Sequence, residues 1–411
     1  MRSVIIIIAA LLALAIAAPA AAQDALCSWG LSGSSTARAW GLEAAGMNPA
    51  HLALYPDGGS SVGLASLGFD LGNNALSLDR YNEISGAVLD EQDKQQLLAE
   101  FPEGGLRIDA GLDASLLGAR FGRYALSSHV IGRGSGTLDR DVFELVLLGN
   151  EIDQAFSFDD TDAEGYALAA ATFSFGVPLY AGERLRLGAG ANWSYLRGLY
   201  YSSLDEATGG LVTTFDGLQG SARALMTTAE GGSGYSADLG LAAELDGRWR
   251  FGLMLESLLG SVTWKSGVER HLWTAEADSV LLGQEDIEDA VVRADSTWSV
   301  DRASSSLPRV LTLGIQREWS RLTLALDGSV LMGEGTGRGE GASALLGAEW
   351  KALSWLRPRL GLGLGRQEGA VAGLGLRLGA LHLNFMGGTR NGYLPGGSRG
   401  MVLGGSLGLR F

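Results

Sequence analysis

Apolar and polar residues alternate with a period of two along many short stretches of this chain, and this alternation constrains the fold most strongly. In 321–332, Leu324 shares one face with other apolar residues at even positions, while Asp327 lies on the opposite face. The same alternation runs through 184–196 and 356–365. Successive side chains of a β-strand point to opposite faces, so this alternation gives each strand one apolar and one polar face. The chain is therefore predicted to be all-β.

Fourteen segments of this kind are predicted as strands: 60–71, 105–121, 123–133, 165–179, 184–205, 234–246, 248–265, 309–319, 321–332, 341–350, 356–365, 370–378, 381–388 and 401–411. Alternate connections are short, at 122, 180–183, 247, 320, 351–355 and 379–380. Longer connections fall at 72–104, 134–164, 206–233, 266–308, 333–340 and 389–400. An even strand number with short turns at one end is typical of a transmembrane antiparallel β-barrel. We therefore predict a barrel of about 14 strands over residues 60–411.

A soluble β-sandwich would also show alternation, but the polar faces here carry arginines and glycines that suit a polar lumen. Two of the long connections contain helical patterns, at 88–101 and 138–149. These short helices are expected in outer loops, where they could fold over the mouth of the barrel.

The N-terminus has the features of a secretory signal peptide. Arg2 is followed by an apolar run from Val4 to Ala18 and then by Ala20-Ala21-Ala22, which predicts cleavage after Ala22. An uncleaved N-terminal anchor is the alternative, and the short apolar run disfavours it. Residues 1–22 are therefore predicted to direct export, and the barrel is expected in the outer membrane of a Gram-negative-type bacterium.

The C-terminal strand ends in Phe411, and an apolar residue at every other position lies on the same face. These residues are Met401, Leu403, Leu407 and Leu409. This pattern is typical of the terminal strand by which barrels are recognised for insertion, so barrel-assembly machinery is an expected partner. Outer-membrane lipid and lipopolysaccharide are the other expected contacts.

Composition argues against several other functions. The net charge of −15 disfavours nucleic acid as a partner, and the single cysteine, Cys27, rules out a disulfide framework. The histidines have no metal-ligand spacing, and no cofactor motif is found, so neither a metal nor a cofactor is predicted. Gly396–Gly400 matches a nucleophile motif around Ser398 but precedes a strand where a helix is required. We therefore predict no enzyme; a lipid hydrolase using Ser398 is the remaining alternative.

Arginines cluster on polar faces near the predicted periplasmic strand ends, and alternation places them in the lumen. They are Arg184, Arg186, Arg248, Arg250, Arg321, Arg357, Arg359 and Arg377. Guanidinium groups could bind an anionic head group such as a carboxylate. The alternative, which we favour, is a structural lattice of ion pairs with lumenal carboxylates or with an N-terminal segment.

Two further patterns have ordinary explanations. The segment 138–164 holds nine carboxylates and one arginine, which indicates a solvated outer loop or, alternatively, cation bridging to lipopolysaccharide. Tryptophans such as Trp193 and Trp350 lie near predicted strand ends, as in the aromatic girdles of membrane barrels.

Residues 32–80 carry a resemblance to a known family. Ser34-Ser35-Thr36-Ala37-Arg38-Ala39 leads to Gly46-Met47-Asn48-Pro49-Ala50 and then to the first strand. This order resembles the N-terminal segment of the long-chain fatty-acid transporters of outer membranes and of the related PorV and PorQ barrels. Residues 89–104 and 138–151 look similar to an uncharacterised branch of that superfamily.

The resemblance implies an N-terminal plug, residues 23–59, lying inside a fourteen-stranded barrel. Asn48, Pro49 and Ala50 would then shape the plug and its contact with the wall; the alternative is an ordinary Asx-Pro turn. The implied function is passive transport of small hydrophobic molecules. The alternative implied by the PorV-like resemblance is an accessory barrel that binds a secreted or surface protein.

Overall fold

The computed structural model describes residues 33–39, 41–55, 60–280, 291–332 and 341–411. The predicted signal peptide, Cys27, residues 23–32 and 56–59 of the predicted plug, and the loop 333–340 lie outside the described residues. The domain limits at residues 22 and 59 therefore stay predictions.

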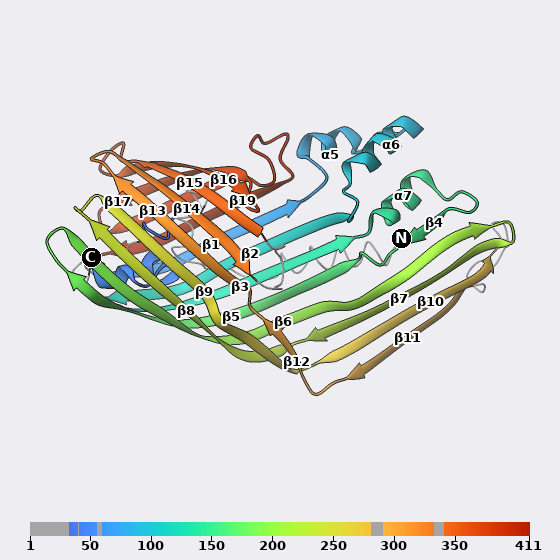
Figure 1. Cartoon of the computed structure of the whole chain (residues 1–411), viewed down its shortest axis with the longest axis horizontal. Coiled ribbons are helices and arrows are strands. Elements are labelled where there is room, and N and C mark those ends of the chain that lie inside the picture. The colour runs from blue at the N-terminus through green and yellow to red at the C-terminus, as the bar shows by residue number, and fades with distance from the viewer. Residues whose placement is uncertain (1–32, 40, 56–59, 281–290, 333–340) are drawn as a thin grey trace.

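Fourteen antiparallel strands close into a barrel (Figure 1). They are β1 (Ser61–Asn73), β2 (Leu106–Phe121), β3 (Tyr124–Leu138), β5 (Asp162–Ala181), β6 (Leu185–Thr214), β8 (Gly231–Leu245), β9 (Trp249–Ser266), β13 (Arg309–Glu318), β14 (Leu322–Met332), β15 (Gly341–Trp350), β16 (Leu356–Gly365), β17 (Gly369–Leu378), β18 (Leu381–Thr389) and β19 (Gly400–Arg410). Each pairs with the next in this order, and β19 returns to β1, from Ser61 opposite Arg410 to Gly72 opposite Gly400. The predicted fourteen-stranded barrel is confirmed.

The alternation of the sequence corresponds to the two faces of the wall. Along β14, exposed and buried residues alternate without interruption, with Leu324 and Leu326 outward and Asp327 and Ser329 inward. Outward leucines suit a lipid environment, and inward polar residues can bond to one another or to the chain inside. The turns between β2 and β3, β5 and β6, and β8 and β9 all lie at one end, which we call the short-turn end.

Strands also occur where long loops were predicted. Beyond the barrel wall, the outer half of β6 pairs with β7 (Gly217–Ala229), β7 pairs with β10 (Glu269–Val280), and β10 pairs with β11 (Val291–Ser299). The short strands β4 (Ala155–Ser157) and β12 (Ala303–Ser306) pair with β6 and β9. The prediction of loops at 206–233 and 266–308 was wrong, because the strands of this extension lack the strict apolar alternation on which strand prediction depends.

Three helices stand at the long-loop end (Figure 1): α5 (Leu78–Ile84), α6 (Glu91–Glu100) and α7 (Arg140–Leu148). The helices predicted in 88–101 and 138–149 are confirmed as α6 and α7. Asp90 begins α6 with a capping box to Asp93. Phe101 after α6 stacks on Phe143 of α7 at 4.3 Å between ring centroids, so the two outer helices pack together.

The N-terminal segment 33–55 forms two short helices, α3 (Glu43–Met47) and α4 (His51–Leu54), inside the barrel toward its short-turn end. Its helix α4 contacts β5, β6 and β8. This placement fits the expected plug. No helix among the described residues is long and apolar enough to cross a membrane.

Candidate functional site

Asn48 ties the plug to the barrel wall. Its side-chain amide donates to the carbonyl of Leu241 on β8 at 3.1 Å and to that of Leu253 on β9 at 3.4 Å. The same amide donates to the carbonyl of Thr36 within the plug at 3.1 Å. Asn48 is fully buried, so the loss of these bonds would leave polar groups unsatisfied away from water.

Pro49 and Ala50 complete the turn that starts α4. The Asn48 side-chain oxygen accepts from the Ala50 backbone N–H at 3.1 Å, which is an Asx turn. Ala50 and Pro49 are buried against β6. The structure thus brings the three predicted residues together at the contact between plug and wall, where they also form an ordinary turn.

Inward glycines of the wall allow this close approach. A Cβ added at Gly188 would lie 2.8 Å from the Ala50 carbonyl oxygen, and one at Gly176 would lie 2.5 Å from the Ala53 nitrogen. A Cβ at Gly190 would overlap the carbonyl carbon of Pro49. Side chains at these positions would therefore displace the plug.

Asp327 on β14 holds the other side of the same plug segment. Its buried carboxylate accepts from the backbone N–H groups of Ser35 at 3.0 Å and Thr36 at 2.8 Å. Sequence reasoning placed Asp327 on an inward face without giving it a role. A role for Asp327 could have been suspected because it is the one carboxylate on the inward face of β14.

His51 is buried within the plug and donates through Nε2 to the carbonyl of Thr36 at 3.0 Å. Burial, with a smaller contribution from nearby Arg250, lowers the pKa of His51 to about 4, although the bond to Thr36 acts in the opposite direction. The ring is therefore neutral at neutral pH, with its proton on Nε2. Together, Asn48, His51 and Asp327 fix the backbone around Thr36.

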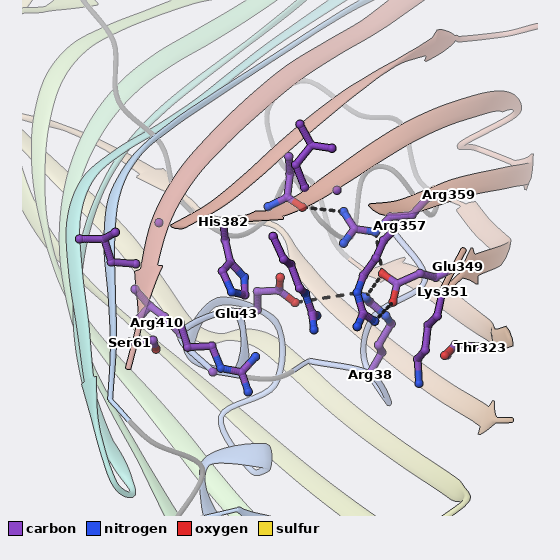
Figure 2. A pocket seen from close by; sticks show the side chains of 18 of the residues that line it. Arg38, Glu43, Ser61, Thr323, Glu349, Lys351, Arg357, Arg359, His382 and Arg410 are labelled. Atoms are coloured by element: carbon purple, nitrogen blue, oxygen red, sulfur yellow. Dashed lines mark hydrogen bonds and ion pairs between the residues drawn. The ribbon is translucent and has the colours of Figure 1, made fainter. Parts of the chain in front are cut away.

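A polar cavity of about 310 Å³ lies between the plug and the wall at the short-turn end (Figure 2). Its charged and titratable lining residues are Arg38, Glu43, Arg250, Glu318, Glu349, Lys351, Arg357, Arg359, Arg377, His382 and Arg410. In Figure 2, His382 and Arg410 lie on one side, and Glu349 with Arg357, Arg359 and Lys351 lies on the other. Arg38 and Glu43 reach the cavity from the plug.

Glu349 is the centre of a buried ion-pair network. It accepts from Arg359 at 2.8 Å, from Arg357 at 3.3 Å and from Arg38 of the plug. Glu318 forms a second network with Arg250 at 3.4 Å and with Lys351. These pairs link the plug to β15 and β16 and agree with the structural lattice that the sequence favoured.

The eight arginines singled out in the sequence fall into two groups. Four of them line the cavity: Arg250, Arg357, Arg359 and Arg377. The other four lie outside the cavity lining: Arg184, Arg186, Arg248 and Arg321. Arg184 is 81% exposed and pairs with Asp246 across a turn at 2.7 Å, and Arg186 pairs with Glu244 at 3.7 Å.

The cavity also uses residues that sequence reasoning did not select. Arg38, Lys351, His382 and Arg410 lie in it, next to strand ends or on the plug. Arg410 belongs to the terminal strand, which was interpreted only through its outward apolar residues. Alternation along this strand could have predicted it: Leu409 and Phe411 are on the outward face, so Arg410 between them points inward.

Other candidate features are engaged locally. The Ser398 hydroxyl, between β18 and β19, donates to the carbonyl of Pro395 at 2.8 Å. In the acidic segment, Asp139 accepts from the Asp160 N–H at 3.1 Å and Asp162 from the Thr137 N–H at 2.9 Å, so these carboxylates hold loop backbone. Within the described ranges, no group of three or more His, Cys, Asp or Glu residues is arranged to hold a metal.

Neither a protein-family model nor a curated protein sequence matches the chain. Solved structures do match. The toluene transporter TodX of Pseudomonas putida is 13% identical, with 93% of this chain and 97% of that chain covered, at a TM-score of 0.51. The toluene transporter TbuX of Ralstonia pickettii is 16% identical, with the same coverage, at 0.50. A TodX variant described as a monoaromatic hydrocarbon channel reaches 0.53 at 13% identity, with 95% and 99% covered.

These likenesses cover nearly the whole of each chain. They confirm the suspected resemblance to transporter barrels at the level of the fold. The resemblance to PorV and PorQ stays a prediction.

Proposed function

We propose that this protein is an outer-membrane channel for the passive uptake of small hydrophobic molecules, with the segment 33–55 as its gate. The observation that carries the proposal is a closed fourteen-stranded barrel whose lumen holds a docked plug. A plug that only filled space would need apolar packing alone. This one has polar contacts with the wall in addition to the apolar packing of residues such as Leu52 and Leu54, and those polar contacts can be exchanged for contacts with water when the plug moves.

The likeness to two toluene transporters supports a hydrophobic substrate. The short-turn end would face the periplasm, as in other barrels of this kind. A solute entering from the long-loop end would then have to pass the segment around Thr36 and Asn48 to leave the lumen. Catalysis is not needed for such passage, and the proposal includes none.

Locking the plug tests this proposal. The Ala53 Cβ and a Cβ built at Gly188 lie 3.0 Å apart, which is closer than the separation of about 3.5–4.5 Å found in disulfides, so α4 has to move slightly away from β6 when the bond forms. Ala53→Cys with Gly188→Cys, in a Cys27→Ser background, is expected to abolish toluene uptake by membrane vesicles under oxidising conditions. Reduction should restore the uptake.

The single variants Ala53→Cys and Gly188→Cys are the matched controls, and each should transport equally with and without reductant. Toluene uptake that is unchanged by a fully formed disulfide would show that this segment is no gate. Uptake no faster than through vesicles without the protein would refute the channel itself.

A second candidate function rests on the sheet extension. Among the described strands, β11 pairs only with β10, so its other edge is open over Val291–Ser299. An open edge can pair with an extended segment of another protein. An accessory role would predict a protein that co-purifies with the intact barrel and is lost when Asp295→Pro interrupts this edge.

A further inference from the structure

The cavity at the short-turn end has an excess of positive charge. Seven Arg and Lys side chains line it, against three carboxylates, Glu43, Glu318 and Glu349. The whole chain has the opposite balance, with a net charge of −15. The positive charge is therefore concentrated in this part of the lumen.

The carboxylates are already engaged by other cations. Glu349 is shared by Arg38, Arg357 and Arg359, and Glu318 is shared by Arg250 and Lys351. Arg377 is different, because no carboxylate of the described residues lies within 4 Å of its guanidinium. Its side chain is partly buried at the cavity surface, near the end of β17.

The Arg377 guanidinium therefore has no carboxylate among the described residues to accept hydrogen bonds from its N–H groups. Its fork of N–H donors matches the two oxygens of a carboxylate or of a phosphate, and such paired bonds are roughly twice as strong as neutral ones. An uncharged hydrocarbon offers no acceptor, and it would remove water from the guanidinium without replacing it. The cavity surface around Arg377 is thus suited to an anion and poorly suited to a hydrocarbon.

The size of the cavity limits the ligand. Its 310 Å³ lies at the lower end of the range for ligand pockets, roughly 300–1,000 Å³. At about 30 Å³ per water molecule, that space is equivalent to about ten waters. A single ring bearing one charged group fits, whereas a long chain would have to extend out of the cavity.

A second cavity lies next to this site at the rim. It lies beside Trp355 and Phe411, and it shares Arg377, His382 and Arg410 with the first cavity. The same side chains therefore face both spaces. An anion bound at Arg377 would lie on the way between the plug and the short-turn end.

We propose that Arg377 and the surrounding cations form a binding site for a small anion whose charged group is a carboxylate or a phosphate. The inference deepens the proposed transport function and rests on it: the anion is a permeating solute with one ring and one carboxylate. Arg377 provides the paired donors, and Arg357 and Arg410, which line the same cavity, add to the positive field. Inorganic phosphate, which has the same bonding chemistry, is the other source of such an anion.

Benzoate and toluene test the proposal, because both have one benzene ring, and benzoate carries a carboxylate where toluene carries a methyl group. Calorimetric titration of the full detergent-purified protein should show benzoate binding at least tenfold more tightly than toluene. Arg377→Gln should weaken benzoate binding at least tenfold and leave toluene binding unchanged. Arg377→Lys should restore part of the loss, because it keeps the charge but not the fork of donors.

Arg223→Gln is the matched control, because Arg223 lies on β7 in the extension and pairs with Glu206 away from the cavity. Phosphate that competes with benzoate in the wild type but not in Arg377→Gln would also support the anion site. Equal affinity for benzoate and toluene, or equal losses in the Arg377 and Arg223 variants, would overturn it. If the anion site is overturned in this way but Arg377→Gln still takes up toluene, the proposed channel function is retained.

Discussion

At the residue scale, two side chains hold the peptide groups around Thr36 from different sides. Asp327 accepts the Thr36 N–H, and Asn48 donates to the Thr36 carbonyl. Asn48 was predicted as a plug residue because the segment Gly46–Ala50 resembles the N-terminal segment of the transporter family. The role of Asp327 could not be predicted, because its partner is 291 residues away in the chain and becomes a neighbour only when the barrel closes.

His51 should make the plug sensitive to acid. Its pKa is about 4 in the folded protein, against 6.5 when exposed, so the unfolded state takes up the proton first as pH falls. The stability contributed by the neutral ring is complete above about pH 6.5 and is lost between that pH and 4. We expect thermal unfolding, followed by tryptophan fluorescence, to show a lower midpoint at pH 4.5 than at pH 7.5.

His51→Gln separates this effect from other titrating groups. Glutamine can donate to the Thr36 carbonyl but does not titrate, so its midpoint should fall less over the same pH range. An identical fall in the wild type and in His51→Gln would show that protonation of His51 has no part in it.

At the scale of elements, the wall strands were predictable because lipid on one side and a filled lumen on the other impose strict alternation. β14 and β16 were predicted to within one residue of their ends. The extension formed by the outer half of β6 with β7, β10 and β11 was not predictable in this way. Its strands are joined mainly by their backbone ladders, with scattered polar pairs such as Arg223 with Glu206, and β11 is exposed along almost its whole length.

Strand β6 also makes a close contact with the plug, and Gly190→Leu should break it. A side chain there would overlap Pro49, so the plug must leave its position or the strand must bend. We expect faster amide hydrogen exchange in residues 33–55 and increased toluene uptake. Gly328→Leu on β14 is the control, since a Cβ there meets nothing within 4 Å. Unchanged exchange in Gly190→Leu would mean that the wall does not set the position of the plug.

At the scale of the whole molecule, the structure combines two regions that should respond differently to the same change. Leu326 is outward and central on β14, in the band expected to face lipid. Val292 is 70% exposed on β11, in the extension beyond the barrel wall. An arginine facing the middle of a bilayer costs roughly 2–4 kcal/mol, whereas one facing water costs little.

Leu326→Arg should therefore lower the unfolding free energy in phospholipid vesicles by roughly 2–4 kcal/mol, while Val292→Arg should leave it nearly unchanged. Urea titration of the vesicle-inserted protein measures both values. Equal losses would mean that the membrane covers the extension as well as the barrel. No loss in either variant would mean that the leucine face of β14 does not face lipid, and the outer-membrane assignment would fall with it. A loss confined to Leu326→Arg would place the extension, which is the outer half of β6 with β7, β10 and β11, outside the bilayer, where the open edge of β11 is accessible from the long-loop end.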